Sequence, residues 1–294
     1  MLTEQKKRLN KIEPLTQEEL RVAYENLDIT DDFMFGKVMQ KERNSVKLLE
    51  RLTGNQIDSV RTVVSQKVIK ITNDSKGVRY DVYVEDDKGR VYDAEMQRYR
   101  SKNKTEILPK RARFYQGLMD LNILNSGQEY AELKQSYVIF ICTFDPFGQE
   151  LCCYQFQNIC IDCDDLPMGD KRKILFFNTK GKKINVSKEV KAFLDYVETK
   201  QTSDDFTREL ENDVAEARHN KEWMVEYMKT YVWEMDARNE GREEGREEGV
   251  IALISTMSEL GCSKLDVHKK LIEKMRISEE EAEIYIKEYM GSEE

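Results

Sequence analysis

Histidine is scarce in this chain of 294 residues, which contains only His219 and His268. A nuclease or a metal site built on histidine is therefore not expected. The chain also lacks a Walker-type glycine-rich loop and a G-x-S-x-G motif, so neither an NTPase nor a serine hydrolase is indicated. No run of about 18 apolar residues occurs, and the first residues lack the apolar core of a secretory signal. We expect a cytoplasmic protein without a membrane span.

Charge is plentiful but unevenly distributed. Charged residues make up 35% of the chain and hydrophobic residues 39%, which is typical of a soluble protein with an ionic surface. The net charge of −9 argues against wholesale attraction to nucleic acid. Residues 201–294 hold 25 Asp and Glu against 13 Lys and Arg, whereas residues 1–200 hold 31 against 34. The acidity therefore belongs to the C-terminal part, and the first 200 residues are mildly basic.

The stretch from Arg79 to Gln97, R-Y-D-V-Y-V-E-D-D-K-G-R-V-Y-D-A-E-M-Q, is typical of a β-hairpin. Two runs rich in Val and Tyr flank a polar turn, which we place at residues 86–90. Side chains alternate along a strand, so residues 81, 83 and 85 share a face with residues 93, 95 and 97. This register pairs Glu85 with Val91, Tyr83 with Asp93, and Asp81 with Glu95.

Asp81 and Glu95 are thus two acids placed opposite each other. Opposed residues in an antiparallel pair have Cβ atoms about 5 Å apart, and like charges there are destabilising. A divalent cation between them would remove the repulsion. Mg²⁺ or Mn²⁺ suits two carboxylates that leave room for water and a phosphate. The alternative is a solvated face whose carboxylates point into water, and the hairpin alone leaves both interpretations open.

An Asp on one strand followed by Glu-x-Gln on the next is accompanied by further sequence words in a fixed order. These are TDDFMFGKVM at 30–39, GVRYDVYVED at 77–86, YDAEMQ at 92–97, KRARFYQGLMD at 110–120 and YVIFICTFDPFG at 137–148. Over roughly residues 28–240 the chain resembles the recombination-promoting nuclease and putative transposase family of the PD-(D/E)xK nuclease superfamily. It departs from the superfamily pattern in two places: Tyr80 replaces the Pro before Asp81, and Gln97 replaces the usual Lys.

The resemblance implies an α/β fold with a restriction-endonuclease-like core, in which helices flank a mixed central sheet in αβββαβ order. It also implies a metal-dependent DNA endonuclease linked to recombination or to mobile-element DNA. Asp81 and Glu95 would hold Mg²⁺ or Mn²⁺, and Gln97 would orient water or bond the phosphate. Superfamily members often add an acid from the first helix. Glu50 is the candidate, with an exposed helix residue as its alternative, while Asp32 has an alternative role as a helix cap.

The segment from Arg98 to Arg113 contains seven Lys and Arg but one acid. We expect a polar loop at residues 98–105 and a helix from about Glu106 or Pro109, because Pro is tolerated in a first turn. Guanidinium and ammonium groups beside a metal site would neutralise a DNA backbone, although a solvated cationic face is the alternative. The predicted DNA-binding residues are Arg98, Arg100, Lys102, Lys104, Lys110, Arg111 and Arg113.

The remaining patterns organise the chain. Helical spacing from Asp31 to Gly54 predicts one helix or two with a break near residues 42–44. Strands are expected at 57–71, 136–144, 150–161 and 173–179, and a helix at 186–198 capped by Ser187. We expect four parts: a helical lead-in at 1–27, the nuclease-like core at 28–200, a charged helical segment at 201–250, and a small helical region at 251–294.

The C-terminal parts carry two open questions. Gly241, Gly245 and Gly249 are four residues apart, which indicates either one face of a helix or a flexible linker, because each Gly costs about 1 kcal/mol in a helix. Residues 251–294 form a segment whose length is marginal for independent folding. We expect them to pack on the main domain or on a second copy, which would form a homodimer through the C-terminal helices.

Six cysteines are present, and Cys160-x-x-Cys163 close to Cys152 and Cys153 raises a zinc alternative. The segment instead resembles a strand in which Cys is a small buried hydrophobe, and reduced thiols are expected.

Three functions follow from these patterns. The first is the metal-dependent DNA endonuclease. The second is a nuclease fold whose chemistry has decayed and which binds DNA or proteins, since Gln97 cannot supply the charge of a Lys. The third is a true transposase, for which no end-recognition or strand-transfer feature is visible in the sequence.

Overall fold

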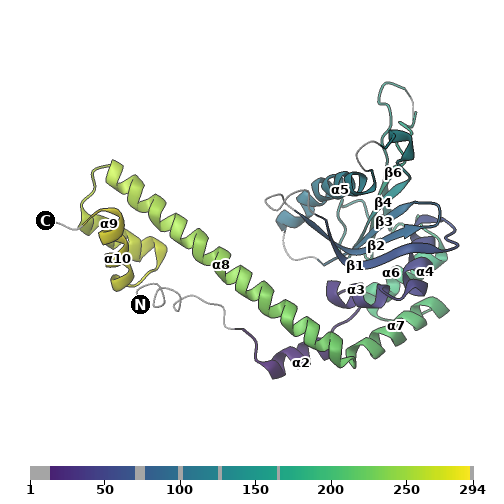
Figure 1. Cartoon of the computed structure of the whole chain (residues 1–294), viewed down its shortest axis with the longest axis horizontal. Helices are drawn as coiled ribbons and strands as arrows, with labels where there is room; N and C mark the ends of the chain where they lie inside the picture. Colours follow the sequence, from purple (N-terminus) through teal and green to yellow (C-terminus); the bar gives the residue numbers. More distant parts are fainter. Residues whose placement is uncertain (1–13, 70–76, 99–101, 125–127, 164–165, 292–294) are drawn as a thin grey trace. The chain divides into compact units, whose positions relative to one another are not determined.

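The structure, a computed structural model, describes residues 14–69, 77–98, 102–124, 128–163 and 166–291. Its elements follow in chain order (Figure 1): α2 (Gln17–Glu25), α3 (Asp32–Met39), α4 (Glu42–Thr53), β1 (Val60–Ile69), β2 (Val78–Asp86), β3 (Val91–Gln97), α5 (Lys102–Ile123), η1 (Tyr130–Glu132), β4 (Ser136–Cys142), β5 (Cys153–Phe156), β6 (Arg172–Asn178), α6 (Lys188–Thr199), α7 (Asp205–Arg218), α8 (Lys221–Glu259), α9 (Lys264–Lys270), η2 (Leu271–Met275) and α10 (Glu279–Tyr289).

The described strands form one mixed sheet in the order β1-β2-β3-β4-β6-β5. Strands β1, β2 and β3 are antiparallel neighbours, β4 is parallel to β3 and β6, and β5 is antiparallel to β6. Parallel strands need a long crossover connection, which α5 supplies between β3 and β4. The restriction-endonuclease-like α/β fold with αβββαβ order is therefore confirmed.

Helices cover both faces of this sheet (Figure 1). On one face, α3, α4, α6 and α7 pack around a core that includes Phe35, Val82, Ala94, Ile139 and Phe193. On the other face, α5 packs around a core that includes Tyr83, Leu108, Met119, Phe140 and Phe176. Strand β4 is buried along its whole length, as its continuous apolar run predicts.

The helices before the sheet show why residues 31–54 break into two pieces. The Asp31 carboxylate caps α3 by accepting hydrogen bonds from the backbone N–H groups of Phe33 and Met34. The chain then leaves the helix at residues 40–41, slightly before the predicted break, and α4 ends at Gly54 with φ 70°. Glycine adopts this left-handed conformation without a steric penalty, so the predicted helix end at Gly54 is confirmed.

The predicted start of α5 was wrong. The helix begins at Lys102 and absorbs part of the expected loop, so Pro109 lies inside it rather than in its first turn. A proline there lacks the N–H that would bond the carbonyl four residues earlier, at a typical cost of about 3 kcal/mol. Burial of Leu108, which precedes the proline, and of Ala112, about one turn later, offsets this cost. Leu121, near the end of α5, is 62% exposed.

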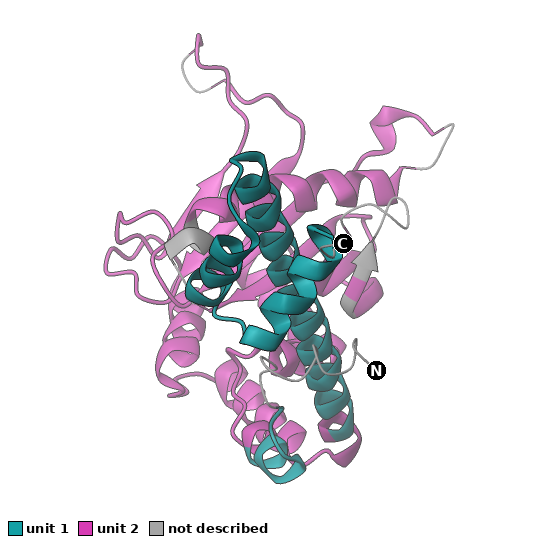
Figure 2. Ribbon diagram, turned by 90° about the vertical axis from the view of Figure 1, so that its left-hand side faces the viewer, with its two compact units in different colours: residues 1–22, 225–294 teal, residues 23–224 magenta. Residues whose placement is uncertain are grey.

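The chain forms two compact units (Figure 2): residues 23–224, and residues 1–22 together with 225–294. The second unit has its own core, in which the last turns of α8 pack with α9, η2 and α10. Helix α8 is continuous through the three glycines, so the helical alternative holds there and the linker alternative does not. A Cβ at Gly249 would lie 3.0 Å from Met275 Cε, whereas Gly241 and Gly245 have open space.

The predicted four-part division and the homodimer stay predictions. Among the described residues, no helix has the length and apolar character needed to cross a bilayer.

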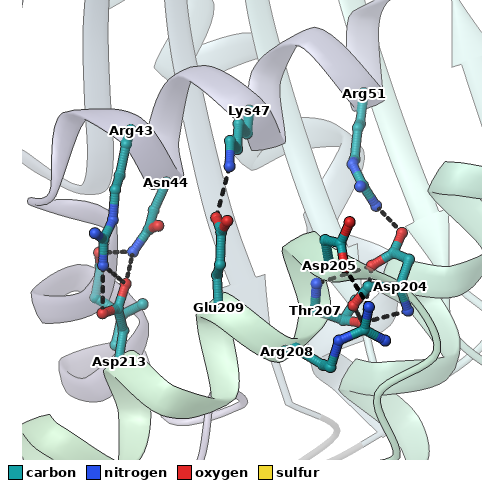
Figure 3. A network of polar contacts seen from close by, with 11 residues as sticks. Arg43, Asn44, Lys47, Arg51, Asp204, Asp205, Thr207, Arg208, Glu209 and Asp213 are labelled. Carbon is teal, nitrogen blue, oxygen red and sulfur yellow. Dashed lines mark hydrogen bonds and ion pairs between the residues drawn. The ribbon is translucent and has the colours of Figure 1, made fainter.

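Charged side chains fasten α7 to α4 (Figure 3). Asp213, which is 4% exposed, accepts hydrogen bonds from Lys41 (2.8 Å), Arg43 (2.6 Å) and Asn44 (2.6 Å). Burial opposes ionisation of Asp213, but these donors outweigh it and lower the pKa of the carboxyl. Two further pairs, each at 2.6 Å, link the same helices: Lys47 with Glu209, and Arg51 with Asp204 at the α7 N-cap.

This network predicts a stability difference between two acids on α7. Asp213→Ala should lower the free energy of unfolding by about 1–3 kcal/mol at neutral pH, because the fully buried Asn44 loses an acceptor. Glu209→Gln, whose pair with Lys47 is solvent-exposed, should cost under about 1 kcal/mol. Since the folded-state pKa of Asp213 is lowered, its contribution is present above about pH 4 and is lost as the pH falls. Urea unfolding at neutral and acid pH measures both effects. Equal costs for the two variants would contradict the account.

Candidate active site

The β2–β3 hairpin has two of the three predicted residue pairs, and its backbone ladder stops before the third, Asp81 with Glu95. Glu85 pairs with Val91 and Tyr83 with Asp93. The regular backbone ladder ends at the pair of Val82 and Ala94. Beyond this point side chains take over as hydrogen-bond acceptors, and this is where Asp81 and Glu95 lie.

The two carboxylates are anchored on each other's strand. Glu95 Oε1 accepts a hydrogen bond from the backbone N–H of Asp81 at 2.9 Å, and Asp81 Oδ2 accepts one from the backbone N–H of Met96 at 3.1 Å. Asp81 is 8% exposed and Glu95 is 2% exposed. Backbone N–H donors hold both side chains in one orientation, so the two carboxylates are pre-positioned and do not extend into solvent. The solvated-face alternative does not describe this pair.

A cavity of about 730 Å³ opens onto both carboxylates between the hairpin and α5. Its volume lies in the usual range for ligand sites, roughly 300–1,000 Å³. Among the described lining residues, cations outnumber acids: Arg79, Arg98, Lys110, Arg111 and Arg113 against Asp32, Asp81 and Glu95. In a chain of net charge −9, this local excess of positive charge favours an anionic ligand.

Of the two acids considered on the preceding helices, Asp32 lines the cavity. Asp32 lies in the first turn of α3 and lines the cavity, with its Oδ2 3.9 Å from Arg79. Glu50 is not among the described lining residues. Its Oε1 accepts the backbone N–H of Ile57 at 2.9 Å and fixes the connection from α4 to β1. Because Asp31 performs the capping, the sequence D-D-F places its second acid at the site. Two consecutive acids at a helix start, Asp31 as the cap and Asp32 after it, were thus the sequence feature that could have indicated Asp32.

The predicted DNA-binding residues fall into three groups. Arg98, Lys110, Arg111 and Arg113 line the cavity together with Asp81, Glu95 and Gln97. Arg98 also lies 3.5 Å from Asp31. Arg100 falls outside the described residues, and Lys102 and Lys104 belong to α5 without a described side chain. Ile107, Phe114 and Tyr115 on α5 complete the wall and were not predicted from the sequence.

Burial dominates the electrostatics of the acids. It raises the pKa of Asp81, and repulsion from Glu95 and Asp32 raises it further. Burial also raises the pKa of Glu95 to about 7, although the N–H of Asp81 and the Arg111 guanidinium act to lower it. Two neighbouring carboxyl groups that resist ionisation in this way gain from an added cation.

Asp93 adds a third buried carboxyl on the same face. It is fully buried, and neither of its oxygens accepts a hydrogen bond from a described donor. Burial, together with repulsion from Glu95 and Asp81, raises the pKa of Asp93. In its protonated form Asp93 can donate a hydrogen bond to Glu95. The Arg111 guanidinium contacts one of these three buried carboxyl groups, that of Glu95.

These residues fit a hard divalent cation with few protein ligands. No cluster of three or more His, Cys, Asp or Glu side chains with metal-binding geometry occurs in the described part of the chain. Asp81 and Glu95 would therefore be the two protein ligands, and water and phosphate oxygens would supply the rest. Mg²⁺ commonly binds in this way, through one or two carboxylates.

Residues 29–160 match the family described as PD-(D/E)XK nuclease family transposase. This region is therefore similar to the domain of that family. The match includes α3, the whole β2–β3 hairpin and α5, and thus every described residue placed at the cavity. No curated protein and no solved structure matched the chain. The PD-(D/E)XK resemblance stated from the sequence is confirmed.

The raised pKa values predict how pH affects the stability of the metal-free protein. Carboxyl groups whose folded-state pKa exceeds the unfolded value of about 4 stabilise the fold at low pH, and that stability is lost as the pH rises through the folded-state pKa. In EDTA, the melting temperature should therefore be lower at roughly pH 8.5 than at roughly pH 5.5. Asp93→Asn keeps the shape and removes one of these groups, so it should reduce the difference.

Glu85→Gln is the matched control for this measurement, because Glu85 lies on β2 outside the cavity and pairs with exposed Arg61. It should leave the pH difference unchanged. An Asp93→Asn protein that loses as much stability between the two pH values as the wild type would contradict the account.

Proposed function

We propose that this protein is a metal-dependent DNA endonuclease that hydrolyses phosphodiester bonds, with Mg²⁺ or Mn²⁺ as its cofactor. The observation that carries the proposal is the placement of Asp81 and Glu95, buried and fixed by backbone N–H groups, in one cavity with cationic walls. The family match supports nuclease chemistry, and its description as a transposase supports a role in recombination or mobile-element DNA.

Three residues of the cavity would have separate roles in the reaction. Asp81 and Glu95 would hold the cation, which when bound polarises a phosphate oxygen and makes water more acidic. Gln97, which ends β3 and lines the same cavity, would orient water or bond the scissile phosphate. Overall, the oxygen of a water molecule bonds to phosphorus and one phosphorus–oxygen ester bond breaks. A proton ends on the departing oxygen, which leaves a phosphate end and a hydroxyl end.

The cationic wall would place the substrate. Lys110 and Arg113 are exposed on α5 at the cavity, and Arg98 follows the end of β3. Arg can bond two phosphate oxygens at once, and Lys acts as a point charge. Such contacts neutralise phosphates regardless of base sequence, so binding should weaken steeply with added salt.

Plasmid nicking tests the proposal. Supercoiled plasmid should be nicked in Mg²⁺ or Mn²⁺ and not in EDTA. Asp81→Asn and Glu95→Gln should each lose at least about 100-fold in rate, because cation-based stabilisation is worth several kcal/mol and about 1.4 kcal/mol is tenfold. Both variants replace a carboxylate with an amide of the same shape, which preserves the two backbone hydrogen bonds. Glu85→Gln should nick like the wild type.

The second candidate is a nuclease fold that binds DNA or protein without cleaving. Gln97 favours it, because an amide cannot supply the positive charge of a Lys. The same experiment separates the two candidates. A wild-type protein that never nicks, yet retards DNA on a gel as strongly as Asp81→Asn and Glu95→Gln, supports the binding module and refutes the endonuclease.

A further inference from the structure

Gln97, which occupies the position where the superfamily usually has Lys, has a cationic partner. Its Oε1 accepts a hydrogen bond from Arg111 Nη1 at 2.8 Å, and its Nε2 donates to the Met96 carbonyl at 3.0 Å. Both ends of the amide are therefore fixed, and its polar face is joined to a guanidinium. The uncharged residue that replaces Lys thus has a cation as its direct partner.

Arg111 is held in this position from several directions. Its Nη2 donates to the Tyr115 hydroxyl at 2.8 Å and lies 3.3 Å from Glu95 Oε2. The guanidinium also lies over the Tyr115 ring, 5.2 Å from its centroid, and 5.6 Å from the centroid of Phe140. Cation–π contact of this kind stabilises a guanidinium that is partly removed from water. The side chain is 32% exposed and lines the cavity, so it is fixed but still reachable by a ligand.

Arg111 differs in this respect from its neighbours on α5. Lys110 and Arg113 are exposed at the cavity, whereas Arg111 extends inward to the buried acid and the motif amide. A guanidinium carries five N–H donors and cannot lose its proton at physiological pH. The bonds to Gln97, Glu95 and Tyr115 use three of these donors, which leaves donors for a phosphate oxygen.

We propose that Arg111 supplies, from α5, the positive charge that a Lys at position 97 would supply from β3. It neutralises negative charge that develops on the reacting phosphate, while its bonds to Glu95 and Gln97 hold it at the required place. This assignment rests on the proposed endonuclease function and adds a catalytic residue to it. It also explains how the site tolerates Gln in place of Lys: the charge has moved to another element.

Relocating the charge tests the assignment. Arg111→Gln should reduce plasmid nicking by about 100-fold, the usual cost of losing one preorganised charge-stabilising donor. Adding Gln97→Lys to that variant should recover at least about tenfold, because the ammonium restores the charge beside Glu95. A role limited to packing against Tyr115 and Phe140 would not be rescued in this way. Arg61→Gln removes the same charge from an exposed site on β1 and should nick like the wild type.

Mn²⁺ affinity, measured by titration calorimetry, gives a second readout that does not depend on nicking. The guanidinium competes with a cation for Glu95, so Arg111→Gln should bind Mn²⁺ as tightly as the wild type or several-fold more tightly. The assignment is overturned if this variant nicks within about threefold of the wild type, if Gln97→Lys gives no recovery, or if Mn²⁺ binding weakens. A wild-type protein that does not nick contradicts the proposed function, whereas weaker Mn²⁺ binding in Arg111→Gln contradicts the charge assignment itself.

Discussion

Repulsion between two buried carboxyl groups is the constraint on which this site depends. Asp81 and Glu95 sit where the hairpin ladder stops, and each accepts a backbone N–H from the other strand. Folding alone does not favour such a pair, because burial and mutual repulsion both resist ionisation. The backbone donors and the Arg111 guanidinium stabilise the two carboxylates, and burial raises the pKa of the neighbouring Asp93. A divalent cation would complete the same compensation, and the site's chemistry would follow from it.

The fold supplies both halves of this arrangement. The antiparallel hairpin brings the acids together, and the parallel partner β4 requires a crossover that lays α5 across the same face. Helix α5 then delivers cations and aromatic rings to the acids from one continuous element. Pro109 removes one backbone hydrogen bond of α5 but does not end the helix, because burial of its apolar side chains on the sheet outweighs the low helix propensity of proline. The geometry of the crossover therefore decides which charges meet the carboxylates.

The sequence predicted what short-range periodicity controls. The alternation of residues 79–97 was sufficient for the hairpin register and for the shared face of the acids, and capping residues such as Asp31 and Gly54 marked the helix ends. The sequence pattern did not predict contacts that depend on tertiary structure. Helical spacing alone did not indicate that Asp32 lines the cavity, because it does not tell which turn of a helix faces the sheet. The starting point of α5 was misplaced for a related reason, since packing overrode its proline. The bond between Arg111 and Gln97 joins residues whose proximity only the crossover determines.

The most direct test of the central claim is anomalous scattering from crystals of the full chain soaked in Mn²⁺. The account predicts one peak in contact with carboxylate oxygens of both Asp81 and Glu95, and its loss in crystals of Asp81→Asn. Crystals soaked at saturating Mn²⁺ that show no peak at these two side chains would contradict it.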